Sequence, residues 1–161
     1  MRIETGDFDD PRVRDLLRAH LAVARSQTAS GGAHALDLTG LRSPHIVLWT
    51  IWVGEELVGC GALKRLAHDH GEVKSMHTVA ARRGGGIGGV MLRHIVAAAR
   101  DGGMSRLSLQ TSSWDYFKPA VALYKRHGFV QCPPFADYVE DPNSVYLSLD
   151  LDRLPEAEPR A

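Results

Sequence analysis

Residues 82–89 read Arg82-Arg83-Gly84-Gly85-Gly86-Ile87-Gly88-Gly89, and they join a segment of strand periodicity to one of helical periodicity. The run before them, Glu72 to Val79, alternates, whereas Ile87 to Arg100 has the apolar spacing of a helix. Five glycines remove the Cβ atoms from this turn, so that backbone N–H groups can approach an anion closely. The following helix directs its positive end and its unpaired first-turn N–H groups to the same place. The stretch therefore predicts a phosphate-binding turn, with two arginines at its edge.

Length and composition limit the classes of protein that this sequence can encode. A chain of 161 residues suits one domain, which we expect over residues 1–151, followed by a disordered polar tail over 152–161. Its 19 basic and 19 acidic residues balance, so nucleic acid is not expected as a partner. The longest apolar run, Ile46 to Val53, is too short to cross a bilayer, and we expect no membrane partner. Without a secretory signal or a CxxC motif, the sequence predicts a reduced, cytoplasmic protein.

The order of predicted elements indicates an α/β (α+β) fold, with a mixed sheet and helices on its faces. Gly54 predicts a hairpin between two of the strands, and Gly59 and Gly61 predict a bulge or a close neighbour in the second of them. Strands are expected at 1–8, 46–53, 57–66, 72–79, 106–111, 129–132 and 145–151, and helices at 11–26, 34–41, 87–100 and 119–127.

The glycine-rich turn has two other interpretations, namely a dinucleotide-binding site and a purely structural turn. Gly84-x-Gly86-x-x-Gly89 satisfies the dinucleotide fingerprint, but Leu109 and Gln110 stand where that motif requires an acidic residue. The turn also follows several strands joined by hairpins, whereas a dinucleotide site opens a βαβ unit. A purely structural turn would need fewer glycines. Both readings remain open on the residues of the turn alone.

A second motif, further along the chain, helps to decide between these interpretations of the glycine-rich turn. Arg83-x-x-Gly86-x-Gly88 is followed by Leu123-Tyr124-Lys125-Arg126-His127-Gly128-Phe129. Together these segments resemble the GNAT superfamily of acetyl-CoA-dependent N-acetyltransferases, and the resemblance covers residues 1–151. Matches such as Gly71-Glu72-Val73-Lys74-Ser75-Met76 are similar to a subgroup of small bacterial members. The resemblance implies a mostly antiparallel central sheet with helices on both faces, and acetyl-CoA as the acetyl donor.

The resemblance also implies which residues hold the donor. The turn would bind the pyrophosphate, and the end of the preceding strand would pair its backbone with the amides of the pantetheine arm. The implied residues are Met76, His77, Thr78, Arg83, Gly84, Gly85, Gly86, Ile87, Gly88 and Gly89.

Acetyl transfer to an amine needs a base for the ammonium, because amines are protonated at neutral pH. Glu72 resembles the acidic residue that some family members carry on this strand. Alternation is expected to place Glu72, Lys74, Met76 and Thr78 on one face, with Lys74 holding Glu72 ionised. His77 is expected on the opposite face and is a weaker candidate. The alternative for Glu72 is a surface carboxylate at a strand end.

Tyr124 is the candidate for stabilising the departing thiolate, because a phenol can donate a proton or a hydrogen bond to sulfur. The alternative is a core tyrosine with its hydroxyl at the rim. We expect no metal, since His68-Asp69-His70 cannot close a coordination shell alone. Cys60 and Cys132 are expected to be small buried residues.

The acceptor site is predicted to lie between residues 30–41 and 135–144. Acidic and aromatic residues there suit a small cationic amine, although loop charges and turn caps would look the same. The predicted function is acetyl transfer from acetyl-CoA to the primary amine of a small molecule by direct attack. The alternatives are a non-catalytic acyl-CoA-binding module and a nicotinamide oxidoreductase. An exposed edge at 145–151 indicates a homodimer. The acidic and aromatic residues of the predicted acceptor site are Asp37, Asp137, Glu140, Asp141, Phe135 and Tyr138.

Overall fold

The computed structural model describes residues 1–28 and 36–153, which form a seven-stranded sheet in the order β1-β2-β3-β4-β5-β7-β6. Every pair of neighbours is antiparallel except β4 and β5, which confirms the predicted mixed sheet. The elements are β1 (Arg2–Thr5), α1 (Pro11–Ser26), α2 (Leu38–Leu41), β2 (Ile46–Val53), β3 (Glu56–Ala67), β4 (His70–Thr78), η1 (Ala80–Arg82), α3 (Ile87–Asp101), β5 (Arg106–Ser112), η2 (Asp115–Phe117), α4 (Lys118–Arg126), β6 (Val130–Gln131), β7 (Ser144–Asp150) and η3 (Leu151–Arg153).

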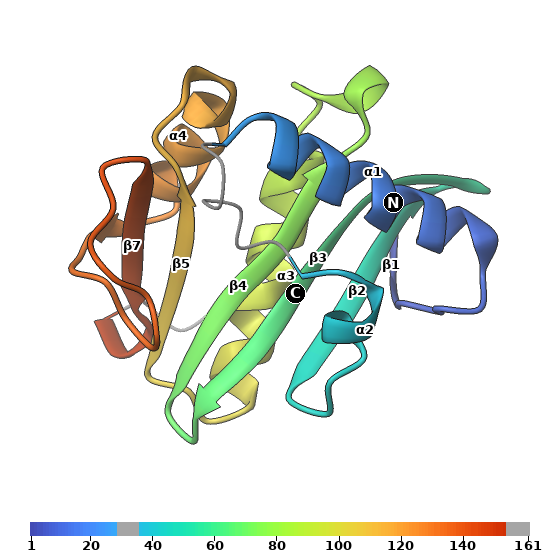
Figure 1. Ribbon diagram of the computed structural model, residues 1–161. Coiled ribbons are helices and arrows are strands. Elements are labelled where there is room, and N and C mark those ends of the chain that lie inside the picture. The colour runs from blue at the N-terminus through green and yellow to red at the C-terminus, as the bar shows by residue number, and fades with distance from the viewer. Residues whose placement is uncertain (29–35, 154–161) are drawn as a thin grey trace.

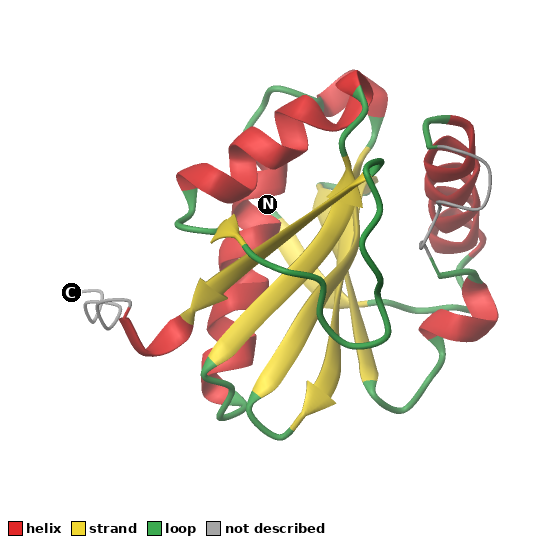
Figure 2. Cartoon of the chain, turned by 60° about the vertical axis from the view of Figure 1, so that its left-hand side comes forward, coloured by secondary structure: helices red, strands yellow, loops and turns green. Residues whose placement is uncertain are grey.

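Helices cover both faces of the sheet, as predicted (Figures 1 and 2). On one face α3 buries Met91, Leu92 and Ile95 in a core that also includes residues of α4 and the strands. On the other face α1 packs Val13 and Leu17 in a second, smaller core. The sheet is therefore the middle of three layers, and each face has its own apolar core.

Local chemistry explains where the elements begin and turn. The side chain of Asp10 accepts a hydrogen bond from the Arg12 N–H and caps α1, with Pro11 in the first turn. Gly54, at φ 59°, makes the β2–β3 hairpin. A Cβ on Gly61 would lie 2.7 Å from Met91 Cγ, so a glycine there lets α3 approach the sheet.

β4 and β5 pair over a short length and then diverge. The parallel ladder joins His70–Glu72 to Arg106–Ser108, with Glu72 opposite Ser108 as its last pair. Beyond that pair, the edge of β4 has no strand beside it among the described residues. Figure 1 shows the two strands separating toward the end of the sheet where α1 and α4 lie. A ligand can therefore bind to the backbone of β4 between them.

A β-bulge interrupts β4 and overturns the predicted alternation. Cys60 pairs with His77 and Ala62 with Lys74, which leaves Gly61 opposite two residues, Ser75 and Met76. Ser75 has a φ of 56°, as a bulged residue can. Because one residue is added, side chains after the bulge exchange faces.

The exchange puts His77, and not Met76, on the same face as Glu72 and Lys74. The His77 ring lies 5.1 Å from that of His20 on α1, whereas the Met76 sulfur lies on the α3 side, beside Gly61. The expectation that Glu72, Lys74, Met76 and Thr78 share a face was therefore wrong.

The C-terminal strand is not the edge that the sequence predicted. β6 pairs with β7 at Val130–Ser148 and Gln131–Leu147, so β7 lies between β5 and β6. The exposed-edge argument for a homodimer thus fails. Of the predicted disordered tail, residues 152–153 belong to η3 and residues 154–161 lie outside the described residues.

Candidate active site

The turn before α3 presents unpaired backbone donors. Gly84 and Gly86 have φ values of 81° and 85°, which residues with a side chain rarely adopt. Gly86 is the N-cap of α3 and offers no side chain to cap it, so the N–H groups of Ile87, Gly88 and Gly89 lack helical partners. A Cβ on Gly88 would lie 3.0 Å from Leu123, so this glycine also lets α4 approach. The turn has the geometry of an anion site.

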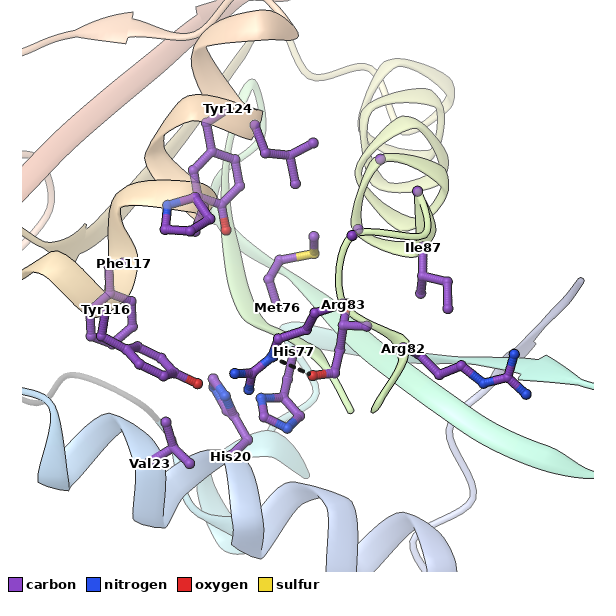
Figure 3. Close-up of a pocket in the computed structure, with 18 of the residues that line it drawn as sticks. His20, Val23, Met76, His77, Arg82, Arg83, Ile87, Tyr116, Phe117 and Tyr124 are labelled. Atoms are coloured by element: carbon purple, nitrogen blue, oxygen red, sulfur yellow. Dashed lines mark hydrogen bonds between the residues drawn. The ribbon is translucent and has the colours of Figure 1, made fainter. Parts of the chain in front are cut away.

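The two arginines of the turn point in different directions. Arg82 lines the cavity, but its side chain extends away from Arg83 and forms an ion pair with Glu56 (Figure 3). Arg83 donates from Nε to the Thr78 carbonyl over 3.3 Å, and its guanidinium lies 5.3 Å from the centre of the Tyr116 ring. Arg83 is therefore the arginine that is held beside the cavity.

A cavity of about 590 Å³ extends from this turn to α4. Arg83, Gly84 and Gly86 line one end of it, and Leu123 and Tyr124 line the other. The predicted donor-binding residues Met76, His77, Thr78, Ile87, Gly88 and Gly89 line it as well, whereas Gly85 does not.

Tyr124 lies at the inner end of the cavity and is 7% exposed. Its ring packs edge-on against Phe129, at 5.8 Å between centres, and its hydroxyl points into the cavity toward Met76 (Figure 3). Burial raises the pKa of the phenol well above its usual value of 10. The Tyr124 phenol is therefore neutral, with its hydroxyl at the rim of the core, and its role toward the thiolate stays a prediction.

A second cavity of about 100 Å³ adjoins the first. Glu72, Lys74 and Ser75 line it, and they do not line the larger one. The residues that line both cavities are His20, Ala24, Met76, Phe117, Ala120 and Tyr124. The phenol of Tyr124 thus stands where a compartment for a long ligand meets one for a small ligand.

Glu72 belongs to a buried cluster with Lys74 and Tyr138. Glu72 is 3% exposed, so the alternative of a surface carboxylate is wrong. Its Oε2 accepts hydrogen bonds from Lys74 Nζ over 3.2 Å and from the Tyr138 hydroxyl over 2.6 Å. Burial and the neighbouring Glu72 raise the pKa of Tyr138, so its phenol stays protonated and donates. The predicted pairing of Lys74 with Glu72 is confirmed.

The rings of two histidines, His20 and His77, lie side by side at the larger cavity. Burial lowers the pKa of His20 and of His77 to about 4 in each case, with the neighbouring His77 adding to the effect on His20. Both rings are therefore neutral at pH 7. The sequence prediction did not include His20 in the site, although it is a polar residue at an apolar position of the α1 pattern.

The acidic residues predicted for the acceptor site do not line either cavity. Asp37 caps α2 through the Gly40 N–H, and Asp141 accepts from the Asn143 N–H in a turn. Asp137 and Glu140 are exposed. For Asp37 and Asp141 the alternative of turn and helix caps is correct. Residues 29–35, part of the predicted acceptor loop, lie outside the described residues.

Phe135 and Tyr138 do come to the site side of the sheet. They pack at 5.1 Å between ring centres, and the Tyr146 ring lies 5.7 Å from Tyr138. Packing within this aromatic cluster places the Tyr138 hydroxyl beside the Glu72 carboxylate.

Both cysteines are free thiols. Cys60 is buried, and burial raises the pKa of its thiol to about 12, whereas Cys132 is only half-buried. Within residues 1–28 and 36–153, no three His, Cys, Asp or Glu side chains are grouped to hold a metal ion. In the same residues, no helix combines the length and the apolar character needed to span a bilayer.

Comparison with known proteins decides the family. The model of the acetyltransferase (GNAT) family matches residues 13–129. The chain belongs to the GNAT family. Its relatives include the uncharacterized N-acetyltransferase YsnE of Bacillus subtilis, 44% identical over 94% of this chain and 100% of YsnE. YedL of Escherichia coli, also an uncharacterized N-acetyltransferase, is 43% identical over 92% of this chain and 94% of YedL.

Solved structures of GNAT-type enzymes share the fold. A Klebsiella pneumoniae protein described as an acyl-CoA N-acyltransferase has a TM-score of 0.78 at 28% identity, over 93% of this chain and 97% of that one. An aminoglycoside 6'-N-acetyltransferase complexed with coenzyme A has a TM-score of 0.71 at 15% identity, over 97% and 100%. An Elizabethkingia anophelis GNAT acetyltransferase with acetyl-CoA bound has a TM-score of 0.68 at 18% identity, over 92% and 97%.

This GNAT protein is an N-acetyltransferase, and therefore an acyltransferase. The comparisons give no support to the alternative of a non-catalytic acyl-CoA-binding module, and the family excludes the nicotinamide oxidoreductase.

Proposed function

We propose that this protein, as one catalytic domain over residues 1–151, transfers the acetyl group of acetyl-CoA to the primary amine of a small molecule. The observation that carries the proposal is the meeting of two cavities at Tyr124. The larger begins at a glycine turn with unpaired amides, and the smaller has a buried carboxylate, Glu72, on its wall. A long phosphate-bearing donor and a small acceptor would therefore meet at one hydroxyl group.

The donor would bind along the larger cavity. Its pyrophosphate would accept hydrogen bonds from the amides of the turn, with Arg83 as a charged donor beside it. The arm would run along β4, where no strand of the described residues lies on the open side of Met76, His77 and Thr78. The relatives with coenzyme A or acetyl-CoA in their structures support this assignment of the donor.

The transfer would be a direct displacement. The amine nitrogen forms a bond to the thioester carbonyl carbon, the carbon–sulfur bond breaks, and the amine proton passes to the Glu72 carboxylate, directly or through water. The sulfur leaves with its electron pair and accepts a hydrogen bond from the Tyr124 hydroxyl. Because burial raises the pKa of Tyr124, the phenol keeps its proton, and the thiolate is protonated after release to solvent.

The proposal extends to the location and the assembly of the protein. Acetyl-CoA is an intracellular metabolite, and Cys60 and Cys132 are free thiols, which supports a place in the cytoplasm. A homodimer stays a prediction, and analytical ultracentrifugation tests it.

The experiment is a thiol-release assay with acetyl-CoA over a panel of small amines, run beside calorimetric titration with coenzyme A. We expect thiol release with at least one amine, and a fall of about 100-fold or more in kcat for Glu72→Gln with the Kd for coenzyme A unchanged. Binding of coenzyme A without thiol release for any amine would instead favour the non-catalytic module.

A further inference from the structure

The wall of the smaller cavity contains one acidic side chain, Glu72, and one basic side chain, Lys74, which form an ion pair. Lys74 is 9% exposed and lies 3.2 Å from Glu72, so the pair is buried and electrically neutral. A simple ammonium ion entering this space would meet the Lys74 charge as well as the Glu72 charge. The charges of the cavity therefore suit an acceptor that carries both signs better than one that is only cationic.

Lys74 also has donor capacity left. Its ammonium has three N–H donors, and two are directed to Glu72 and to the Tyr138 hydroxyl. A ligand oxygen could take the third. A carboxylate would suit it best, because a hydrogen bond between two charged groups is the strongest kind available.

Ser75 supplies an independent observation. Its side chain is 8% exposed and lines the smaller cavity, and its hydroxyl oxygen has no hydrogen-bond partner within the described part of the chain. A buried hydroxyl without a partner destabilises the fold, and so does a φ of 56° at a residue with a Cβ. The unpartnered hydroxyl and the positive φ thus occur at the same residue, Ser75, which is adjacent to Lys74. A ligand bound in the smaller cavity could form the missing hydrogen bond with the Ser75 hydroxyl.

We propose that the acceptor is a small zwitterion of the α-amino-acid kind, with its carboxylate on Lys74 Nζ and Ser75 Oγ and its amine between Glu72 and the thioester. The volume of about 100 Å³ fits the amine and carboxylate of such a molecule and is well below that of pockets for drug-sized ligands. This inference rests on the proposed function and gives its substrate class.

The test measures thiol release with the common amino acids and, for each that reacts, with its carboxamide and its decarboxylated amine. Rates are compared per concentration of unprotonated amine, since the three forms differ in amine pKa. We expect kcat/KM to be about 10- to 100-fold higher for the amino acid than for either analogue, as a hydrogen bond to a charged group provides. Equal or faster reaction of the carboxamide or the decarboxylated amine would overturn the proposal.

Two variants test the residues. Ser75→Gly removes the hydroxyl and relieves the positive φ, so the fold should persist, and we expect KM for the amino acid to rise about tenfold with little change for the carboxamide. Ala136→Gly is the matched control, because Ala136 also has a positive φ, 52°, and lines neither cavity. Lys74→Met should abolish the preference for the carboxylate, and Ser75→Gly decides alone if Lys74→Met does not fold. An unchanged preference in Ser75→Gly contradicts the assignment.

The outcomes also separate the two proposals. If simple amines are acetylated and amino acids are not, the zwitterion is wrong and the proposed function stands. If coenzyme A binds and no amine of any class releases thiol, both are wrong.

Discussion

The Tyr138 hydroxyl donates a 2.6 Å hydrogen bond to Glu72 Oε2, although the two residues are 66 positions apart in the chain. Tyr138 belongs to the segment between β6 and β7, whereas Glu72 is the last residue of β4 that pairs with β5. The bond, together with Lys74, holds the carboxylate in one position at the smaller cavity. Tyr138 is thus a positioning residue for the proposed base.

Replacing Tyr138 by phenylalanine tests this relationship. Tyr138→Phe keeps the ring and removes the donor to Glu72, and we expect kcat to fall about tenfold because a hydrogen bond to a charged group is lost. Tyr146→Phe is the matched control. Its hydroxyl donates over 2.7 Å to the Val139 carbonyl, so it also contacts this segment but not Glu72. Steady-state kinetics that show equal losses in kcat for both variants would count against a specific role for Tyr138.

Tyr124→Phe should affect the chemical step more than donor binding. The variant keeps the ring packed on Phe129 and removes the hydroxyl that faces the cavity. We expect kcat to fall by about 10- to 100-fold, since a donor to a developing negative charge is lost, with the Kd for acetyl-CoA changed less than twofold. Kinetics and calorimetry on the same preparations measure both. An unchanged kcat excludes Tyr124 from thiolate stabilisation.

Two glycines at opposite ends of α3 separate donor binding from backbone strain. Gly86 and Gly103 have φ values of 85° and 81°, and at both a Cβ would meet no atom of residues 1–28 and 36–153 within 4 Å. Alanine at either position should lower the free energy of unfolding by about 1 kcal/mol, because both must adopt a left-handed conformation. Only Gly86→Ala should weaken coenzyme A binding, since Gly86 lines the larger cavity and Gly103 does not. Equal Kd values for the two variants would place the pyrophosphate elsewhere.

The buried histidines predict how stability depends on pH. Burial lowers the pKa of His20 from 6.5 to about 4 in the folded chain. Between these two pH values His20 is protonated in the unfolded chain but neutral in the folded chain. The contribution of neutral His20 to the free energy of unfolding is therefore fully present above about pH 6.5 and decreases as the pH falls toward 4.

Replacing His20 by phenylalanine should remove this loss, which is about 3 kcal/mol at pH 4. Thermal melts of His20→Phe and of the wild type between pH 7 and pH 4 measure the difference. His68→Gln is the control, because the His68 side chain is 93% exposed. Parallel curves for His20→Phe and the wild type would show that His20 titrates normally in the folded chain.

The local elements and the glycine turn could be predicted because each depends on neighbouring residues. Asp10 and Pro11 are enough to begin α1, and Gly54 is enough to close a hairpin, since caps and turns are satisfied within a few positions. The same holds for the N–H groups before α3, which are unpaired whatever the rest of the chain does. These features, with the Tyr124 motif, led to the family, which the comparisons show, and to the donor site that we propose.

Other features depend on pairing and packing between distant segments. Gly59 and Gly61 predicted an irregularity in β3, and the bulge does lie opposite Gly61. That Ser75 of β4 carries the extra residue could not be predicted, because a bulge is a mismatch in length between β4 and β3. The bulge moved His77 onto the face of Glu72. The meeting of Tyr138 with Glu72 required the aromatic cluster to fold over the sheet. The amino-acid sequence by itself thus determined the glycine turn with its unpaired N–H groups, at which we propose that the phosphates of the donor bind. The register of the strands and the path of the segment before β7 decided which side chains face the acceptor, since those follow from contacts that no local pattern encodes.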